Sequence, residues 1–474
     1  MVFNSIQFVV FFAVVYGLYR LLPHRAQNWL LLIASYWFYA AWDWRFLGLL
    51  IASTVVDYSV ARYLDTQTDQ TRRRRVLWIS IGFNLGVLGF FKYFGFFAEN
   101  LQVLLAWAGL DVGLPVLHVV LPIGISFYTF MTMSYVIDVY RREIAATTHP
   151  LDFAVFVAFF PHLVAGPILR APVLLPQISS PRRITTEQIV EGSWLVGWGL
   201  FKKVFVADNL APIVTAVFAH GHVPSGNEVL VGVYAFAFQI YGDFSGYSDI
   251  ARGLSKWMGI ELNLNFRFPY FVRSPQAFWR HWHISLSTWL RDYLYISLGG
   301  NRGSRWATYR NLMITMVLGG LWHGAAWPYV LWGAYHGTLL VAYRWVGERF
   351  TATRFLVSLE RPAWRLVGWA VMFHLTCYGW LLFRARSAEQ IGAMTSALFS
   401  GWGRPSPEVA AQVLALAGYS APLVVVHGWE AFTDDLDAVL KLPLVARYAV
   451  YVALAYLLVL FGEFGGSQFI YFQF

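Results

Sequence analysis

Long apolar segments alternate with short polar or basic stretches along almost the whole chain. A helix that crosses the ~30 Å hydrocarbon core of a bilayer needs about 20 predominantly apolar residues, or fewer where it re-enters. Segments that approach this length lie at about 3–22, 28–43, 46–62, 76–97, 115–139, 151–169, 189–206, 229–250, 311–326, 329–343, 364–383, 409–427 and 446–464. The pattern predicts an all-α polytopic membrane protein with about 11–13 membrane segments.

The composition supports this interpretation. Hydrophobic residues make up 58% of the chain and charged residues 13%, and the charged share is about half the ~25% that is usual in soluble domains. The net charge of +9 lies mainly in the connecting stretches, where it indicates topology and contact with anionic membrane lipids rather than nucleic-acid binding. The single cysteine, Cys377, lies in an apolar run and is interpreted as a small buried side chain, so no disulfide is expected within the chain.

Basic residues orient the predicted segments, because Lys and Arg accumulate on the cytoplasmic side of a membrane. The run Arg72–Arg75 predicts a cytoplasmic loop, whereas Ala98–Gly113 contains no Lys or Arg and is expected outside. Gly428–Arg447 is expected inside, which places the C-terminus outside. The second half does not repeat the first, so residues 1–474 are interpreted as one membrane domain.

Two adjoining stretches depart from the simple alternation. Arg252–Arg310 carries nine basic residues among many aromatic ones, which predicts amphipathic or half-inserted helices on the cytoplasmic side. Asn311–Tyr343 has no charged residue, and as one helix it would extend ~50 Å, far beyond the hydrocarbon core. A break near Pro328 therefore predicts a hairpin with both ends cytoplasmic and with His323 near its tip.

His323 is the first candidate for catalysis. An ionisable residue in a segment that reads as membrane interior is costly and therefore usually functional. Burial disfavours the imidazolium, so a neutral ring that accepts a proton near pH 7 is expected. The neighbouring Trp322 supplies an apolar wall, and Gly324 is expected to leave room for substrate. The alternative is a structural histidine that is hydrogen-bonded between helices.

His283 is the second candidate. On a continuous helix Trp279, His283 and Ser287 are spaced four apart and share one face, which favours an active-site role for the histidine. His281 is interpreted as a residue of the membrane interface. The pair His281-x-His283 lacks the carboxylate or thiolate partners of a metal site, so no metal is predicted.

The stretch Tyr241–Asp249 places two carboxylates and two hydroxyls at the end of an apolar run. One interpretation is a capped helix end at a membrane boundary, and the other is substrate positioning by Asp243 and Ser245. Asn265 is expected to shape a turn, with polar-headgroup contact open. The sequence contains no Gly-x-Ser-x-Gly elbow, P-loop or Rossmann fingerprint.

Several motifs are found together in one known family. They are Phe278-Trp279-Arg280-x-Trp282-His283-Ile284-Ser285, Tyr293-Leu294-Tyr295-Ile296 with Leu298-Gly299-Gly300-Asn301-Arg302, Trp322-His323-Gly324, Tyr128-Thr129-Phe130 with Ser134-Tyr135-Val136-Ile137-Asp138-Val139-Tyr140, and Ala165-Gly166-Pro167-Ile168. In combination the chain resembles the membrane-bound O-acyltransferase (MBOAT) superfamily, and within it the bacterial alginate O-acetyltransferase (AlgI) type. His281 departs from the Arg of the family pattern.

The resemblance implies a ring of helices around a thinned central funnel that admits an acyl thioester from the cytoplasm. It assigns His323 as the essential histidine and His283 as a second histidine across the tunnel. The side chains then expected to contact substrate are Trp279, Trp282, Ser287, Trp322, Asp243, Ser245, Asn265 and Arg280. No cofactor is expected to stay bound, and the donor is expected to be acetyl-CoA or another acyl thioester whose phosphates meet the basic Arg252–Arg310 stretch.

The C-terminal residues Phe469–Phe474 resemble a motif whose tyrosine carries the acyl group outward, which makes Tyr471 either an acyl relay or an aromatic anchor in the membrane interface. The implied function is transfer of an acyl group, acetyl first, to an extracytoplasmic polysaccharide such as alginate. The implied location is the bacterial inner membrane with a periplasmic C-terminus. The implied partners are a periplasmic transferase of the SGNH-hydrolase type and the polysaccharide assembly machinery.

Other acceptors stay open, because the polymer is chosen by partners outside this chain: peptidoglycan, cellulose and teichoic acid. A polysaccharide or lipid transporter or flippase is the alternative from another class. It is disfavoured because transporters often show internal repeats and intramembrane acidic residues, and neither a repeat nor a mid-span acidic pair is evident.

Overall fold

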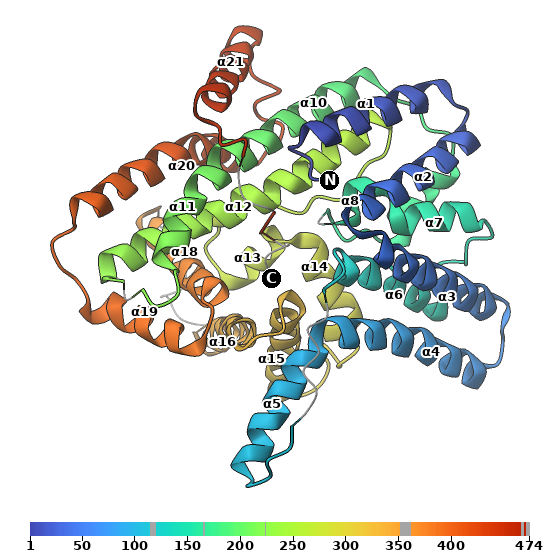
Figure 1. Cartoon of the computed structure of the whole chain (residues 1–474), viewed down its shortest axis with the longest axis horizontal. Coiled ribbons are helices and arrows are strands. Elements are labelled where there is room, and N and C mark those ends of the chain that lie inside the picture. Colours follow the sequence, from blue (N-terminus) through green and yellow to red (C-terminus); the bar gives the residue numbers. More distant parts are fainter. Residues whose placement is uncertain (114–119, 165, 223, 351–361, 466–468, 471–474) are drawn as a thin grey trace. The chain divides into compact units, whose positions relative to one another are not determined.

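The computed structural model describes residues 1–113, 120–164, 166–222, 224–350, 362–465 and 469–470. Its regular structure is helical, and these ranges contain no β-strand (Figure 1), which confirms the all-α prediction. The chain divides into two compact units, one of Met1–Val196 with Ile250–Asn263 and one of Gly197–Asp249 with Leu264–Phe474. The expectation of one membrane domain over residues 1–474 stays a prediction.

Helical elements make up the regular structure of the first unit. They are α1 (Ile6–Leu21), α2 (His24–Asp43), η1 (Trp44–Phe46), α3 (Leu47–Thr66), α4 (Gln70–Leu88), η2 (Gly89–Tyr93), α5 (Phe94–Trp107), α6 (Ile125–Arg141), α7 (Pro150–Ala158), α8 (Phe160–Leu163) and α9 (Ala171–Ser179). Two further helices, α10 (Thr186–Leu200) and α12 (Gly226–Trp257), contribute residues to both units.

Five helical stretches in the described ranges are long and apolar enough to cross a membrane. They are His24–Thr66, Gln70–Trp107, Trp364–Arg384, Pro407–Thr433 and Leu444–Phe461. The predicted segments 28–43 and 46–62 correspond to α2 and α3, which the short element η1 separates. These stretches confirm that the protein passes through the membrane several times.

The predicted segment 76–97 ends too early, because the helix continues through Trp107, whereas the expected external location of Ala98–Gly113 stays a prediction. Apolar residues keep helical spacing past Ala98, and the helix ends where Gly109 adopts a φ of +79°. A glycine with positive φ is a common helix stop, since it pays no Cβ penalty in that conformation.

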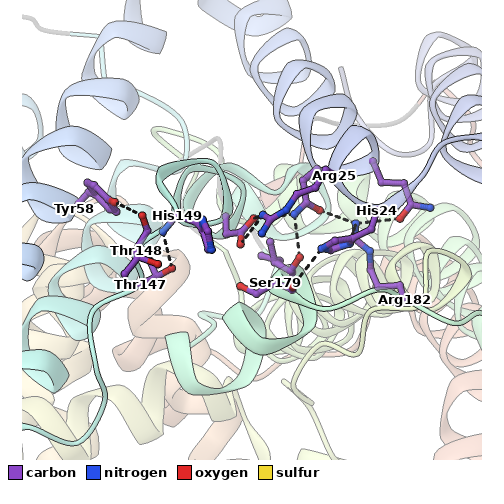
Figure 2. A network of polar contacts seen from close by, with 12 residues as sticks. His24, Arg25, Tyr58, Thr147, Thr148, His149, Ser179 and Arg182 are labelled. Carbon is purple, nitrogen blue, oxygen red and sulfur yellow. Dashed lines mark hydrogen bonds and ion pairs between the residues drawn. The ribbon is translucent and has the colours of Figure 1, made fainter.

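A polar network fastens α2 to α7 and α9 inside the first unit (Figure 2). Arg25 Nη1 donates to the buried carboxylate of Asp152 at 3.0 Å, and the amide of Asn28 donates to the same carboxylate at 2.9 Å. Arg182 donates to Asn28 Oδ1 at 2.6 Å, and His24 contacts the Ser179 carbonyl. These groups satisfy one another at the edge of an apolar interior, as buried polar groups generally must.

A second polar cluster lies between α3 and α4. Asp57 is fully buried, and its carboxylate accepts hydrogen bonds from Ser80 Oγ and from the amide of Asn84. Both of these partners are neutral donors rather than a second carboxylate. The transporter alternative therefore gains no mid-span acidic pair from this cluster.

The second unit holds the segments that carry the predicted site. Besides its share of α10 and α12 it contains η3 (Phe201–Ala207), α11 (Asp208–Val217), η4 (Pro269–Phe271), α13 (Pro275–His281), α14 (Ile284–Trp289), η5 (Leu290–Tyr295), α15 (Arg305–His323), α16 (Trp327–Phe350), α18 (Pro362–Arg384), α19 (Ala388–Ser400), α20 (Pro407–Thr433) and α21 (Leu444–Phe461). As predicted for the basic stretch, only the short elements η4, α13, α14 and η5 occur between residues 258 and 304.

The predicted hairpin is confirmed, and it is formed by α15 and α16. Glycines let the two helices approach closely, since a Cβ on Gly320 would lie 2.2 Å from the Tyr329 carbonyl oxygen and one on Gly333 would lie 2.4 Å from that of Met316. His323 is the last residue of α15. The break comes just before α16, whereas Pro328 is the second residue of α16, where its missing N–H costs nothing.

Candidate functional site

The second unit brings the two predicted histidines together. The centroids of the His283 and His323 rings lie 6.3 Å apart, although 40 residues separate the two positions in the sequence. His283 is 0% exposed and His323 is 6% exposed. The two rings therefore share one buried place, where a reacting group between them would be shielded from water.

A break in the helical chain between α13 and α14 positions His283 next to His323. His283 has a φ of +43° and separates α13 from α14. The backbone after the break is held by Asn265, whose carbonyl accepts from the Ile284 N–H at 2.9 Å and whose side-chain oxygen accepts from Ser285 Oγ at 2.9 Å. A left-handed φ is costly for a residue with a Cβ, and these bonds hold it.

The expected shared helix face is therefore wrong. Trp279 lies on α13 and Ser287 on α14, with the break at His283 between them. The local sequence suits a helix throughout, but the hydrogen bonds that Ile284 and Ser285 donate to Asn265, 18 residues before His283, end it. Asn265 is thus placed as a support of the site, and its predicted contact with substrate stays a prediction.

Aromatic side chains surround the two rings. The His323 ring centroid lies 5.0 Å from that of Trp322, 5.1 Å from Trp332 and 5.2 Å from Phe383. His283 belongs to none of the five long apolar stretches, and burial lowers its pKa to about 3. His283 is therefore neutral at neutral pH, and a neutral imidazole can both accept and donate a proton.

Gly324 has a different role from the one expected. A Cβ at this position would lie 2.1 Å from the ring of Tyr329, so the space left by the glycine is filled by that ring. The backbone at Gly324 is extended, with φ −165°, which any residue could adopt. The prediction that Gly324 makes room for substrate is wrong, because the glycine is required by the packing of the hairpin tip.

The Tyr241–Asp249 stretch lies inside α12 rather than at a helix end, which corrects the capping interpretation. The 32-residue helix continues to Trp257, because its polar residues find partners on a neighbouring segment. Asp243 is buried, and its carboxylate pairs with Lys203 Nζ at 2.7 Å. Ser245 is buried one residue from Phe244, whose ring centroid is 4.7 Å from that of His283.

Two lysines of the π-helical segment η3, Lys202 and Lys203, were not predicted as part of the site. Lys203 Nζ also lies 2.8 Å from Asp208, and Lys202 Nζ lies 2.6 Å from Asp249. Both lysines are buried. The available signal was two adjacent lysines inside the apolar run 189–206, because buried cations are rarely retained without acidic partners.

The chain's C-terminal region returns to α12 next to the histidines. The backbone N–H of Ile470 donates to the Asp243 carboxylate at 2.6 Å. Phe469 is 4% exposed, and its ring centroid lies 4.8 Å from that of Tyr247 and 6.1 Å from that of Phe244. Tyr471, the predicted relay, lies outside the described residues.

A cavity of about 430 Å³ opens beside α13, α14 and the hairpin. Three of the side chains predicted to contact substrate, Trp279, Arg280 and Ser287, are in its lining, together with Arg291 and Arg344. The described residues that line it include no Asp or Glu. The cavity is therefore electropositive, and a ligand with phosphate or carboxylate groups suits it.

The cavity is linked to the histidines by a short series of rings. The Trp279 ring lies 5.6 Å from that of Trp332, which lies 5.1 Å from that of His323. Met316, also in the lining, precedes His323 by seven residues on α15, or about two helical turns along the same face.

The two remaining tryptophans predicted to contact substrate, Trp322 and Trp282, differ in their surroundings. Trp322 lies 5.9 Å from His283 between ring centroids, whereas Trp282 is 2% exposed in an aromatic cluster, 4.6 Å from Trp380. Among the described residues no group of three or more His, Cys, Asp or Glu side chains could hold a metal ion. The arrangement supplies two imidazoles in an apolar enclosure next to an anion-binding cavity.

Comparison with known proteins identifies the family of the chain. Residues 28–383 match the family described as MBOAT, membrane-bound O-acyltransferase. The chain is 45% identical over 403 residues to the probable alginate O-acetylase AlgI of Azotobacter vinelandii, covering 84% of this chain and 78% of that protein. It is 46% identical over 402 residues to the probable alginate O-acetylase AlgI of Pseudomonas aeruginosa, covering 84% and 75%.

A more distant relative is named for a different acceptor. The peptidoglycan O-acetyltransferase of Helicobacter pylori is 34% identical to this chain over 424 residues, covering 82% of this chain and 78% of that protein. The resemblance drawn from the motifs is thus confirmed, and the match favours an acyltransferase over a transporter. The chain belongs to the membrane-bound O-acyltransferase family and is a multi-pass membrane acyltransferase.

Proposed function

We propose that this enzyme moves an acetyl group from a cytoplasmic acyl thioester to the hydroxyl groups of an extracytoplasmic polysaccharide, alginate in the first instance. The observation that carries the proposal is the pair His283 and His323, buried 6.3 Å apart and one aromatic ring beyond the lining of an electropositive cavity. The choice of alginate rests on the names of the relatives at 45% and 46% identity.

His323 is the proposed general base. An acceptor hydroxyl attacks the thioester carbonyl while its proton passes to the imidazole of His323, so that a C–O bond forms and the C–S bond breaks. The proton then passes from His323 to the departing thiolate, which leaves as a thiol. His283, neutral because it is buried, donates a hydrogen bond to the oxygen on which negative charge develops.

The arginine-lined cavity is the proposed donor site. Arg291 pairs with Asp292 and Arg344 with Glu348, whereas Arg280 has no ion pair with another described residue. Arg280 is also exposed, so its guanidinium is available to the phosphates of coenzyme A or of an acyl carrier protein. The apolar part of the lining, including Met316 and Leu340, suits the thioester arm.

Replacing Arg280 by alanine is expected to raise the KM for acetyl-CoA roughly tenfold or more with a smaller change in kcat, because a hydrogen bond to a charged group contributes about 1.5–3 kcal/mol. The measurement is the initial rate of acetyl release from labelled acetyl-CoA by membrane vesicles. Arg273→Ala is the matched control, since Arg273 is also exposed but does not line the cavity. Equal KM values in the two variants would contradict the assignment.

Tyr471 is the proposed first acceptor. Its neighbour Ile470 is bonded to Asp243, and Phe469 packs on Phe244, whose ring contacts His283. The phenol oxygen takes the acetyl group as an ester. A hydroxyl of the polymer or of a periplasmic transferase then attacks that ester, which regenerates the phenol.

Tyr471→Phe removes only the hydroxyl, and it is expected to reduce ester-linked acetyl in the exported polysaccharide to the background of a deletion strain. The control is Tyr456→Phe, on the exposed face of α21, which should acetylate normally. Normal acetylation in Tyr471→Phe at equal membrane levels would show that the acetyl group reaches its acceptor without this tyrosine. The same cells report the polymer, because acetate released from alginate and from peptidoglycan can be assayed separately.

The proposed location is the bacterial inner membrane, with the C-terminus on the periplasmic side. The orientation rests on the basic residues, above all Arg72–Arg75. The proposed partners are a periplasmic transferase of the SGNH-hydrolase type, which places the acetyl group on the polymer, and the polysaccharide assembly machinery. Peptidoglycan is the second candidate acceptor, favoured by the Helicobacter pylori relative.

A further inference from the structure

A second cavity, of about 240 Å³, lies in the same unit between α12, the η4 segment, α18 and α20. Its lining consists of aromatic and aliphatic side chains with one histidine: Tyr234, Phe238, Tyr241, Phe268, Pro269, Tyr270, Phe271, Trp369, Phe373, Leu416, Leu423, Val424 and His427. Nothing in the proposed acyl transfer uses this cavity. It shares no lining residue with the arginine-lined cavity.

The polar groups of the lining residues on α12 and α20 are satisfied by partners. Tyr241 Oη donates to His427 Nε2 at 3.1 Å, and His427 Nδ1 donates to the buried carboxylate of Glu430 at 2.6 Å. Tyr234 Oη donates to His374 Nε2 at 2.7 Å. These bonds occupy the hydroxyl and ring nitrogens that could otherwise bind a polar ligand.

The same holds at the η4 segment. Tyr270 Oη donates to the Ala237 carbonyl at 2.6 Å, and Trp369 Nε1 donates to the Tyr270 carbonyl at 2.6 Å. The cavity therefore presents hydrocarbon and aromatic surface to its contents. A cavity of this kind does not hold water, since water needs two to four polar partners. Among the described residues, its lining also lacks the free hydrogen-bonding groups that a sugar or a nucleotide would require.

The size of the cavity and its walls point to the source of an apolar occupant. A cavity of about 150 Å³ lined by apolar side chains holds a benzene molecule, so 240 Å³ accommodates a longer hydrocarbon segment. Two of the walls, α18 and α20, are among the stretches apolar enough to cross the membrane. Both helices also expose apolar side chains, such as Val371 on α18 and Val425 on α20, so lipid chains run alongside them.

We propose that the cavity between α12, α18 and α20 is a binding site for an acyl chain of a membrane phospholipid. The chain enters between the two spanning helices and packs against Phe238, Phe373 and Leu423. Its contact with Tyr241, whose ring centroid is 6.1 Å from that of Trp282, places the lipid behind the aromatic cluster that backs the histidines. The lipid thus supports the packing of the site without taking part in the reaction.

The test uses the purified full-length enzyme in nanodiscs of phosphatidylethanolamine and phosphatidylglycerol that include a phosphatidylglycerol with a mid-chain diazirine. After irradiation, adducts are mapped by peptide mass spectrometry. We expect adducts on the cavity side of α20, at Leu423 and Val424, that persist when unlabelled lipid is added in excess. Adducts spread evenly over exposed positions such as Leu414 and Val425, and lost on dilution, would overturn the proposal.

Leu423→Trp fills the cavity and is expected to cause loss of the persistent adducts, while Leu414→Trp, on the exposed face of the same helix, retains them. If Leu423→Trp does not yield folded enzyme, Val424→Trp at the partly exposed wall makes the same test. Persistent adducts in a folded cavity-filling variant would contradict the assignment.

Labelling of His323→Ala separates the two proposals, because its adducts should persist whether or not acetyl transfer is lost. Labelling by a diazirine fatty acid but not by the phospholipid would assign the cavity to free fatty acids and overturn the phospholipid proposal.

Discussion

Replacing His323 by alanine is expected to lower the rate of acetyl transfer by roughly 10²–10⁴-fold, because a positioned general base contributes about that much. His323 is the last residue of α15, held among Trp322, Trp332 and Phe383 in a place that excludes water. The measurement is the initial rate of transfer from labelled acetyl-CoA, together with polymer-bound acetyl in cells.

The matched control is His149→Ala, because His149 is exposed and lies in the first unit. It should acetylate like the wild type. Membrane levels and thermal unfolding of the purified variants must be equal for the comparison to hold. Full activity of His323→Ala would exclude base catalysis by this residue. A loss in His323→Ala with normal acetylation in Tyr471→Phe would keep the base and remove the tyrosyl relay.

Replacing Lys203 by methionine is expected to destabilise the second unit by about 3–5 kcal/mol, since breaking a buried ion pair leaves an uncompensated charge. Lys203 Nζ lies 2.7 Å from Asp243 and 2.8 Å from Asp208, and both carboxylates are buried. The change should also lower activity, because Asp243 holds the backbone of Ile470 beside the histidines. Thermal unfolding in detergent measures the first effect.

The triple variant Lys203→Met, Asp208→Asn, Asp243→Asn removes the charges together and is expected to recover part of the stability, as neutral replacement of buried ion pairs often does. Lys441→Met is the exposed control, because Lys441 pairs with Asp435 at the surface, and such pairs contribute little. An unfolding temperature of Lys203→Met equal to that of Lys441→Met would contradict a structural role for the buried cluster.

The fold class and the candidate reactive groups could be predicted from the sequence because they depend on local pattern and composition. Apolar runs of helical length predict membrane helices wherever they occur. The uncharged run Asn311–Tyr343 is too long for one span, so its folding into a hairpin with His323 near the tip followed from length alone. His283 and His323 could be singled out because imidazoles in such surroundings are rare.

The errors share a cause, which is that partners distant in the sequence decide local conformation. The helix expected through His283 is broken by bonds from Asn265, and the helix expected to end near Asp249 continues because lysines of η3 neutralise its carboxylates. The space at Gly324 is filled by Tyr329 from the other arm of the hairpin. In each case the residues around the affected position give no indication of the distant partner.

The sequence by itself determined that this is a helical membrane protein and which side chains are candidates for its chemistry, because hydrophobic burial and residue type act locally. Only the tertiary structure decided that His283 turns toward His323, that Asp243 receives the chain near its C-terminus, and that Arg280 lines a cavity next to the histidines. These outcomes depend on hydrogen bonds and ion pairs between buried groups that are distant in the sequence. A buried polar group is stable only when its partner is in place, so neither position alone indicates the pairing.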